Sequence, residues 1–333
     1  CGVSLDEASI LRNLKTETTN YVIDNFSKIP YRFVATATPT PNDFIEILNY
    51  AVFLNIADRG HLLTRFFQRD STKAGHLTLY PNKKKEFWQW VSTWAVFVTK
   101  PSDLGHADEG YALPELELIE HCVSKPQKES YINKKGKVEL FEDANRDLTS
   151  IAKEKRETIP VRVTKCMEIV KARAGQMVIF CHLNPEQDEI EKALKEAGIS
   201  YSSIRGGESE KQKETKLNAW RNKETDILLT KDTMYGSGVN LQQAHEMCFV
   251  GLNHKFNNFI QGIHRIYRFG QLNACRVHLI FTRNEYPILK VLYKKWEQHK
   301  ELQSEMISLV KEYGLNTTII KQQMERQIES ISW

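Results

Sequence analysis

The sequence lacks any stretch that could span a membrane or direct export. Its longest apolar runs, such as the one at residues 177–181, fall far short of the ~20 residues that a membrane span needs. The first residues show no basic segment followed by a signal-like apolar core. We therefore expect a cytoplasmic protein without a membrane partner.

Cysteine is scarce and never paired along the chain. The six cysteines stand at positions 1, 122, 166, 181, 248 and 275, and no two of them form a C-x-x-C pair. A zinc ribbon and a thioredoxin-type site are therefore not indicated. Neighbours such as Cys181 and His182 point to opposite faces of a strand and make poor shared ligands. We expect reduced thiols, several of them buried, and no metal-thiolate chemistry.

The composition is that of a two-domain globular protein. Of 333 residues, 41% are hydrophobic and 26% charged, which suffices for two cores. The net charge of +4 is mildly basic and by itself says little about partners. Lysines gather at 83–85 and within 124–137, where they could meet phosphate or simply form solvated loops.

Strand and helix patterns alternate along the second half of the chain. The expected strands cover residues 177–183, 199–204, 226–230, 247–252 and 275–281. The expected helices cover residues 185–198, 208–222 and 256–270. Repeated strand-helix units with short connections predict a parallel sheet covered by helices.

The first hundred residues give a more mixed pattern. Short strands are expected at residues 3–5 and from Tyr31. Residues 43–100 have a helical pattern rich in aromatics, and we expect Trp90 and Trp94 to build a core rather than stack on bases.

The helical period is lost after residue 100, at a segment that contains Gly105 and Pro114. This predicts a domain boundary near residue 113. We divide the chain into domains at 1–112 and 113–284 and a helical extension at 285–333.

Asp6 and Glu7 form an acidic pair at the end of the first strand. Such an Asp can hold Mg²⁺ through its water shell, while the next carboxylate activates a water that attacks a γ-phosphate. The alternative is a solvated turn, which is common for such a pair. Thr36 and Thr38 close the next strand at the same edge, where they could bond these carboxylates or belong to a turn before a helix capped by Asn42.

The strongest signal is the run QGIHRIYRFGQ at residues 261–271. On a helix, Gln261, Arg265 and Arg268 would share one stripe at i, i+4 and i+7. A guanidinium is planar and permanently charged and can bind two oxygens, which suits the charge of a transferring phosphoryl group. The alternative is that the two arginines are ordinary surface residues without a role in binding. Gln261 and the Gly-Gln ending of the run disfavour this alternative.

Two glycine-bearing segments follow expected strands. Gly236 and Gly238, with Asn240 after them, would let the backbone approach a phosphate or a facing domain. Arg205 and Gly206 could present backbone amides at a helix start to a nucleic-acid phosphate. Either segment could instead be a tight turn.

Taken in order, these segments resemble the motifs of superfamily 2 helicases and translocases, most closely the Swi/Snf-type branch in the compact form carried by phages and prophages. DEAS at residues 6–9 resembles motif II, TATP at 36–39 motif III, and VIFC at 178–181 motif IV. YGSGVNL at 235–241 resembles motif V, and residues 261–271 match the specific Q-x-x-x-R-x-x-R-x-G-Q pattern of motif VI. The resemblance covers nearly the whole chain.

The resemblance implies an α/β fold of RecA-like parallel sheets covered by helices, with one truncated lobe, one complete lobe and a helical C-terminal extension. It implies ATP and Mg²⁺ as cofactors and DNA as the partner, held mostly by its phosphate backbone, with duplex favoured. The activity would be ATP-dependent movement on DNA, in a bacterial or phage-infected cell.

The same resemblance implies the residue roles. Asp6 would position Mg²⁺, Glu7 would activate the water, and Arg265 and Arg268 would be arginine fingers. The implied nucleotide-binding residues are Gly236, Gly238, Asn240, Gln261, Arg265 and Arg268. The implied residues for coupling and DNA contact are Thr36, Thr38, Arg205 and Gly206.

One part of the family pattern is missing, because no G-x-x-x-x-G-K-[ST] phosphate loop occurs in the sequence. We therefore expect the C-terminal portion of a longer protein, which begins just before motif II and by itself binds ATP weakly and hydrolyses it negligibly. A non-catalytic DNA-binding or scaffold remnant and an RNA helicase remain alternatives. The Gly-Gln ending and the aromatic helical block favour the DNA branch.

Overall fold

The computed structural model describes residues 1–70, 75–124, 154–234, 239–313 and 322. Its contacts divide the chain into two compact units. Unit 1 comprises residues 1–111 and 294–333, and unit 2 comprises residues 112–293. The functional domain limits near residues 113 and 284 remain predictions.

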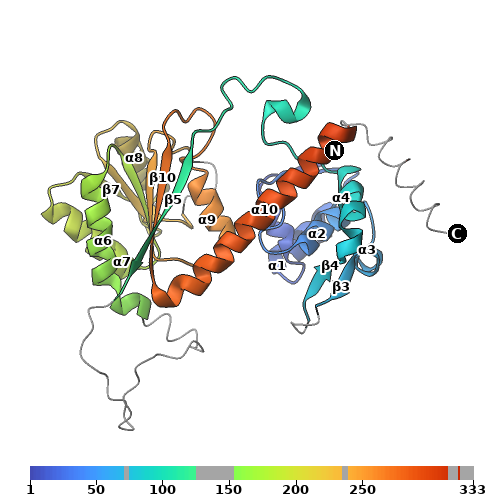
Figure 1. Ribbon diagram of the computed structural model, residues 1–333, viewed down its shortest axis with the longest axis horizontal. Helices are drawn as coiled ribbons and strands as arrows, with labels where there is room; N and C mark the ends of the chain where they lie inside the picture. Colours follow the sequence, from blue (N-terminus) through green and yellow to red (C-terminus); the bar gives the residue numbers. More distant parts are fainter. Residues whose placement is uncertain (71–74, 125–153, 235–238, 314–321, 323–333) are drawn as a thin grey trace, which may run out of the picture. The chain divides into compact units, whose positions relative to one another are not determined.

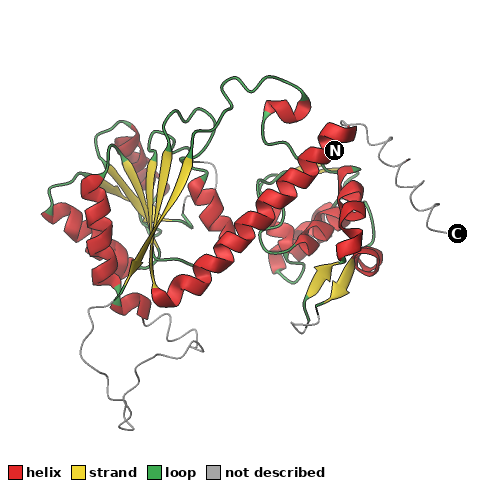
Figure 2. Cartoon of the chain, viewed as in Figure 1, coloured by secondary structure: helices red, strands yellow, loops and turns green. Residues whose placement is uncertain are grey.

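Unit 2 is built on a six-stranded sheet with the order β5-β10-β9-β6-β8-β7, in which every neighbouring pair is parallel (Figure 2). Its strands are β5 (Leu116–Val123), β6 (Met177–Cys181), β7 (Tyr201–Ser203), β8 (Ile227–Lys231), β9 (Glu246–Val250) and β10 (Cys275–Thr282). The predicted α/β class, a parallel sheet covered by helices, is confirmed.

The helices of unit 2 flank this sheet (Figure 1). They are α6 (Ile159–Ala172), α7 (Asn184–Glu196), α8 (Glu210–Arg221), α9 (Phe256–Ile263) and the first residues of α10 (Tyr286–Tyr313), which follows the short η5 (Arg283–Glu285). Because strand residues alternate between faces, Ile179 and Cys181 join the core with α6 and α7, whereas Phe180 faces Gly262 of α9. Strand β6 is buried at every position, as expected for a parallel strand covered on both faces.

Unit 1 contains a two-stranded parallel sheet and an antiparallel hairpin. Its strands are β1 (Gly2–Leu5), β2 (Tyr31–Val34), β3 (Phe67–Arg69) and β4 (Leu77–Leu79). Its helices are η1 (Ala8–Arg12), α1 (Glu17–Phe26), η2 (Phe44–Glu46), α2 (Ile47–Phe53), α3 (Arg59–Phe66), η3 (Pro81–Lys83), α4 (Lys84–Ser92), η4 (Pro101–Leu104) and the later residues of α10.

The expectation of a helical pattern throughout residues 43–100 is wrong in two places, since β3 and β4 interrupt it and α4 ends at Ser92. Phe67 is buried in the aromatic core of unit 1. This apolar segment can therefore contribute to the core as a strand as well as it could as a helix. The structural role of the tryptophans is confirmed: Trp88 and Trp90 are buried, and the Trp90 and Trp94 rings pack edge to face at 5.5 Å.

All six cysteines are free thiols, and four of them are buried, which confirms the expected burial of several thiols. Among the described helices, none combines the length and apolar character needed to cross a membrane.

Candidate functional site

The acidic pair lies at the carboxyl end of β1, beside the end of β2. The ladder continues past the strands, because the Ala35 amide donates to the Leu5 carbonyl at 2.8 Å. This register brings Asp6 and Glu7 next to Thr36. Glu7 adopts a left-handed conformation with φ 51°, and its amide donates to Asp6 Oδ1 at 2.9 Å. Strained backbone of this kind recurs at functional sites.

Thr36 and Thr38 form a compact turn beyond β2. The Thr38 amide donates to Thr36 Oγ1 at 3.2 Å, and the Thr38 side chain is buried. The alternative in which Asn42 caps the helix is not formed: Asp43 is at the cap position of η2, and the Asn42 side chain donates to Glu46 Oε1 at 2.7 Å. Burial raises the pKa of Glu46, although hydrogen bonds from Asn42 oppose that shift. The turn is thus fixed to the start of α2.

The acidic pair fits a magnesium ion that keeps most of its own water. Asp6 is exposed at the strand end and Glu7 is half-buried, so oxygen ligands face solvent there. Mg²⁺ is commonly held by one or two carboxylates together with water and substrate phosphates. Among the described residues, no cluster of three or more His, Cys, Asp or Glu side chains could hold a metal by itself. Any magnesium here would depend on the phosphate groups of a nucleotide.

In unit 2, the predicted helical stripe of Gln261, Arg265 and Arg268 is wrong in its geometry. Helix α9 ends at Ile263, and the chain continues in turns to Gly270, which has φ 85°. Only Gln261 lies on the helix. The Gln271 side chain stabilises these turns, because its amide donates to the carbonyls of Gln242, Ala244 and Ile266 at 2.8–3.2 Å.

The two arginines of this run lie in different environments. Arg265 is only 8% exposed, and its Nη1 lies 3.5 Å from the Val239 carbonyl. Its own carbonyl accepts a hydrogen bond from the Leu241 amide at 3.0 Å. Arg268, in contrast, is exposed. Arg265 therefore binds the segment after β8, while Arg268 faces solvent.

That segment carries the other expected nucleotide contacts. Asn240 is exposed, and its Oδ1 accepts a hydrogen bond from the Gln242 amide at 3.0 Å. Gly236 and Gly238 lie outside the described residues. The structure therefore brings the end of the motif V segment to Arg265 and Gln271, but it does not place these two glycines.

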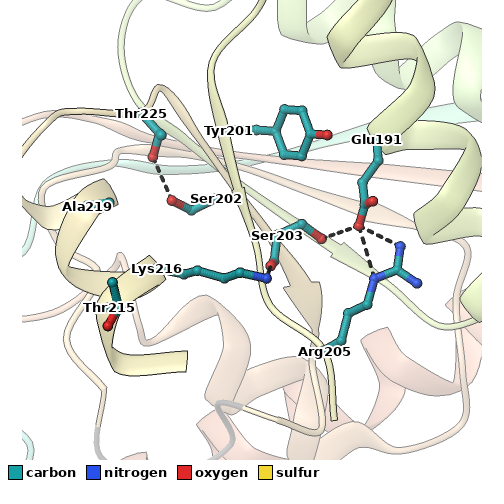
Figure 3. A pocket seen from close by; sticks show the side chains of 9 residues that line it. All are labelled: Glu191, Tyr201, Ser202, Ser203, Arg205, Thr215, Lys216, Ala219 and Thr225. Atoms are coloured by element: carbon teal, nitrogen blue, oxygen red, sulfur yellow. Dashed lines mark hydrogen bonds and ion pairs between the residues drawn. The ribbon is translucent and has the colours of Figure 1, made fainter. Parts of the chain in front are cut away.

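Arg205 borders an open hollow of about 490 Å³ between β7, α7 and α8 (Figure 3). Its guanidinium donates to Glu191 at 2.6 and 3.1 Å and forms an ion pair with Asp188 at 2.7 Å. These bonds raise the pKa of Arg205 despite its partial burial. A phosphate at Arg205 would have to compete with two carboxylates. Gly206 is exposed nearby, before α8.

The sequence reasoning missed a polar cluster at the carboxyl ends of β6, β8 and β9, formed by His182, Asp232 and Asn253. The Asn253 side-chain nitrogen lies 3.2 Å from His182 Nδ1 and 3.1 Å from Asp232 Oδ2. The available signal was position alone, because each residue follows a predicted strand within a few residues. We call this group the edge cluster.

A second feature that the sequence did not indicate is a buried ionic network, which is formed by Arg162, Glu186, Glu285 and Lys155. Arg162 on α6 is 1% exposed and lies 3.3 Å from Glu186 and 3.9 Å from Glu285. Glu285 also pairs with Lys155 at 3.2 Å. Gly251 passes directly over the guanidinium with φ 83°, where an added Cβ would lie 2.3 Å from Arg162 Nη1.

With this geometry in hand, comparison with known proteins gives one family match within unit 2. Residues 161–270 match the model of the helicase conserved C-terminal domain. Unit 2 contains a superfamily 2 helicase C-terminal domain. This helicase domain includes the edge cluster, Arg162 and nearly all of the run at 261–271.

The relatives of this chain are ATP-dependent helicases by name, and one of the two described here is named as an RNA helicase. The uncharacterized ATP-dependent helicase YqhH of Bacillus subtilis (strain 168) is 23% identical over 94% of this chain and 62% of its own length. The ATP-dependent RNA helicase eIF4A of Yarrowia lipolytica is 32% identical over 35% of this chain and 29% of its own. The chain thus spans less than two thirds of either relative.

Two solved structures resemble part of the chain. The C-terminal part of the Fun30 ATPase domain has a TM-score of 0.37 at 14% identity, covering 45% of this chain and 54% of that one. The C-terminal domain of the DEAD-box protein Dbp5 has a TM-score of 0.36 at 15% identity, covering 45% of this chain and 90% of that one.

Proposed function

We propose that this chain is part of an ATP-dependent DNA helicase or translocase, in which ATP hydrolysis drives movement on duplex DNA. The observation that carries the proposal is the junction between Arg265, Gln271 and residues 239–244, of which all but Gln271 lie in the range that matches the helicase C-terminal domain. This junction holds the end of the segment after β8 and the arginine-bearing turn together, next to the first residues of β9 and β10.

The proposal gives the two arginines different roles. Arg268 is exposed, so its guanidinium is available to the charge on a transferring phosphoryl group. Arg265 is bound to the Val239 carbonyl and keeps the nucleotide-contacting segment in place. Gln261 and Asn240 would complete the nucleotide contacts from α9 and from that segment.

In unit 1, the proposal gives Asp6 the coordination sphere of a hydrated Mg²⁺ and Glu7 the activation of the attacking water. Mg²⁺ would supply charge neutralisation of the phosphates. The exposed position of Asp6 and the left-handed turn at Glu7 support this assignment. Thr36 and Thr38 would pass the state of the nucleotide to the DNA contacts.

Glu7→Gln tests the proposed chemistry in the full-length natural protein. We expect ATP turnover to fall by about 10²–10⁴-fold, the usual contribution of a general base, with DNA affinity unchanged. Glu17→Gln, at an exposed glutamate in the first turn of α1, is the matched control and should leave turnover unchanged. Equal activity in both variants would refute the role of Glu7.

DNA is the proposed substrate, and RNA is the alternative that the names of the eIF4A relatives favour. Fluorescence anisotropy with duplex DNA and duplex RNA of equal length would distinguish them. We expect affinity for DNA to be higher and log K to fall linearly with log salt, as phosphate contacts require. Tighter binding to RNA would select the alternative. Absence of salt-sensitive binding to either would refute the proposal.

A further inference from the structure

We propose that Asn253 is a positioning residue, whose side-chain amide fixes the three loop starts at the sheet edge in the arrangement that binds nucleic acid. The inference rests on the proposed function and goes beyond it, because Asn253 lies outside every segment that the motif resemblance assigned.

The amide of Asn253 is fully used. Its Nδ2 donates one hydrogen to His182 Nδ1 at 3.2 Å and the other to Asp232 Oδ2 at 3.1 Å. Its Oδ1 accepts from the Lys255 amide at 2.8 Å, at the start of α9. All three polar positions of the group therefore have a partner, which fixes its orientation.

Both partners of the amide are themselves held in place. His182 Nε2 donates to the Gly251 carbonyl at 3.1 Å, which leaves Nδ1 of the neutral ring to accept from Asn253. Asp232 is almost completely buried. Burial opposes its charge, but the His182 ring 3.6 Å away and the hydrogen bond from Asn253 outweigh that effect and lower the pKa of Asp232. A buried carboxylate of this kind depends on its donors.

The three side chains start three different loops. His182 follows β6 and precedes α7, and Asp232 follows β8 and precedes the segment with Asn240. Asn253 lies between β9 and α9, the helix that leads to Arg265 and Arg268. One amide therefore ties together the end of the motif IV strand and the two connections that lead to the motif V and motif VI segments. A change at Asn253 should shift these segments relative to one another.

An aspartate could not replace this asparagine. Asn253→Asp keeps the shape but removes both donors, and it places a second carboxylate about 3 Å from buried Asp232, where like charges repel. Asn253→Ala removes the amide without adding charge. The pair separates lost positioning from added repulsion.

The matched control is Asn218→Asp, at an exposed asparagine of α8 in the same unit. It adds the same charge without touching the edge cluster. Anisotropy with labelled duplex DNA, and with RNA in parallel, gives the affinity of the chain. Thermal unfolding gives the stability of each variant, and affinities are compared well below every melting temperature.

We expect Asn253→Ala and Asn253→Asp to weaken nucleic-acid binding by about tenfold or more, while Asn218→Asp stays within about twofold. His182→Gln, which keeps one donor and one acceptor, should retain most of the affinity, and His182→Leu should not. If Asn253→Asp does not fold, Asn253→Ala and the His182 pair decide the matter.

Each outcome has one meaning. If the unmodified chain binds neither DNA nor RNA, the proposed function fails. If the unmodified chain binds and the Asn253 variants bind equally well, the positioning role is refuted while the function stands. A lower melting temperature with unchanged affinity would likewise refute positioning, because it would show a purely structural role.

Discussion

The two parallel sheets of this molecule are covered to very different degrees. In unit 2, β6 is buried along its whole length, and a buried ionic network lies behind the strand ends. In unit 1, alternate residues of β1 and β2 are exposed, including Tyr31 at 66% and Phe33 at 61%. Parallel sheets are usually covered on both faces. The pair β1 and β2 carries its acidic residues on a sheet with one open face.

This difference bears on how precisely each unit can hold its chemistry. The edge cluster of unit 2 is fixed by hydrogen bonds among three strand ends, and the network around Arg162 supports the same edge. Asp6 has only the turn at Glu7 to orient it among the contacts described above. Buried polar groups that are hydrogen-bonded to one another favour one arrangement, whereas an exposed carboxylate has fewer contacts to fix it.

The largest expected effect comes from breaking the network in unit 2. Arg162→Met removes the cation between two buried carboxylates, so Glu186 loses its cationic partner and Glu285 keeps only Lys155. We expect unit 2 to lose about 3–5 kcal/mol of unfolding free energy. Lys165→Met, at a half-exposed lysine on the same helix, should cost less than about 1 kcal/mol.

Urea unfolding followed by hydrogen exchange of separate peptides would assign this loss to one unit. Peptides of β6 and β9 should exchange faster in Arg162→Met, while those of β1 and β2 should not change. If Arg162→Met cost no more than Lys165→Met, the network would not be what distinguishes the two sheets.

A smaller, pH-dependent effect should appear at the edge of the same sheet. His121 of β5 and His278 of β10 share one hydrogen bond, with Nε2 and Nδ1 3.0 Å apart. Burial, the His121 ring and Arg276 lower the pKa of His278 to about 4. Because the pKa of His278 is lower in the folded than in the unfolded protein, protonation favours the unfolded protein. The unfolding free energy is therefore highest with respect to this group above pH of about 6.5, and it decreases as the pH falls towards 4.

The shift corresponds to at most about 3 kcal/mol, at 1.36 kcal/mol for each pKa unit. His278→Gln cannot titrate, so its unfolding free energy should fall less than that of the unmodified chain between neutral pH and pH of about 4. Carboxylates titrate equally in both proteins and cancel in the difference. An equal decrease in unfolding free energy in the two proteins would show that protonation of His278 does not destabilise the pair of strands β5 and β10.

The same contrast explains what the sequence could predict. Strands β6, β8, β9 and β10 were placed within a few residues, because each is an apolar run bounded by polar residues. The end of α9 was not predicted, because the turn after Ile263 depends on hydrogen bonds between Gln271 and residues 242–244. Gln271 lies beyond the helix, and residues 242–244 are distant from it in sequence. Local periodicity carries no information of that kind.

The candidate site was predictable only in part, for the same reason. The spacing predicted Arg265 and Arg268 as candidates, but it did not show that Arg265 is buried beside Val239 while Arg268 is exposed. The edge cluster required knowledge of which strands are neighbours, since β6, β8 and β9 are not consecutive in the chain. Sequence order alone does not bring His182 next to Asn253.

The smallest expected effect tests the open face of unit 1. Phe33→Ser replaces an exposed aromatic on β2, so unfolding free energy should change by about 0.5 kcal/mol or less, as for most surface substitutions. Phe180→Ala in β6, at a buried phenylalanine, should cost about 3–5 kcal/mol. Urea unfolding of each variant at several protein concentrations measures both. A loss above about 1 kcal/mol for Phe33→Ser would mean that this face is covered in solution, and the two sheets would then not differ as the structure indicates.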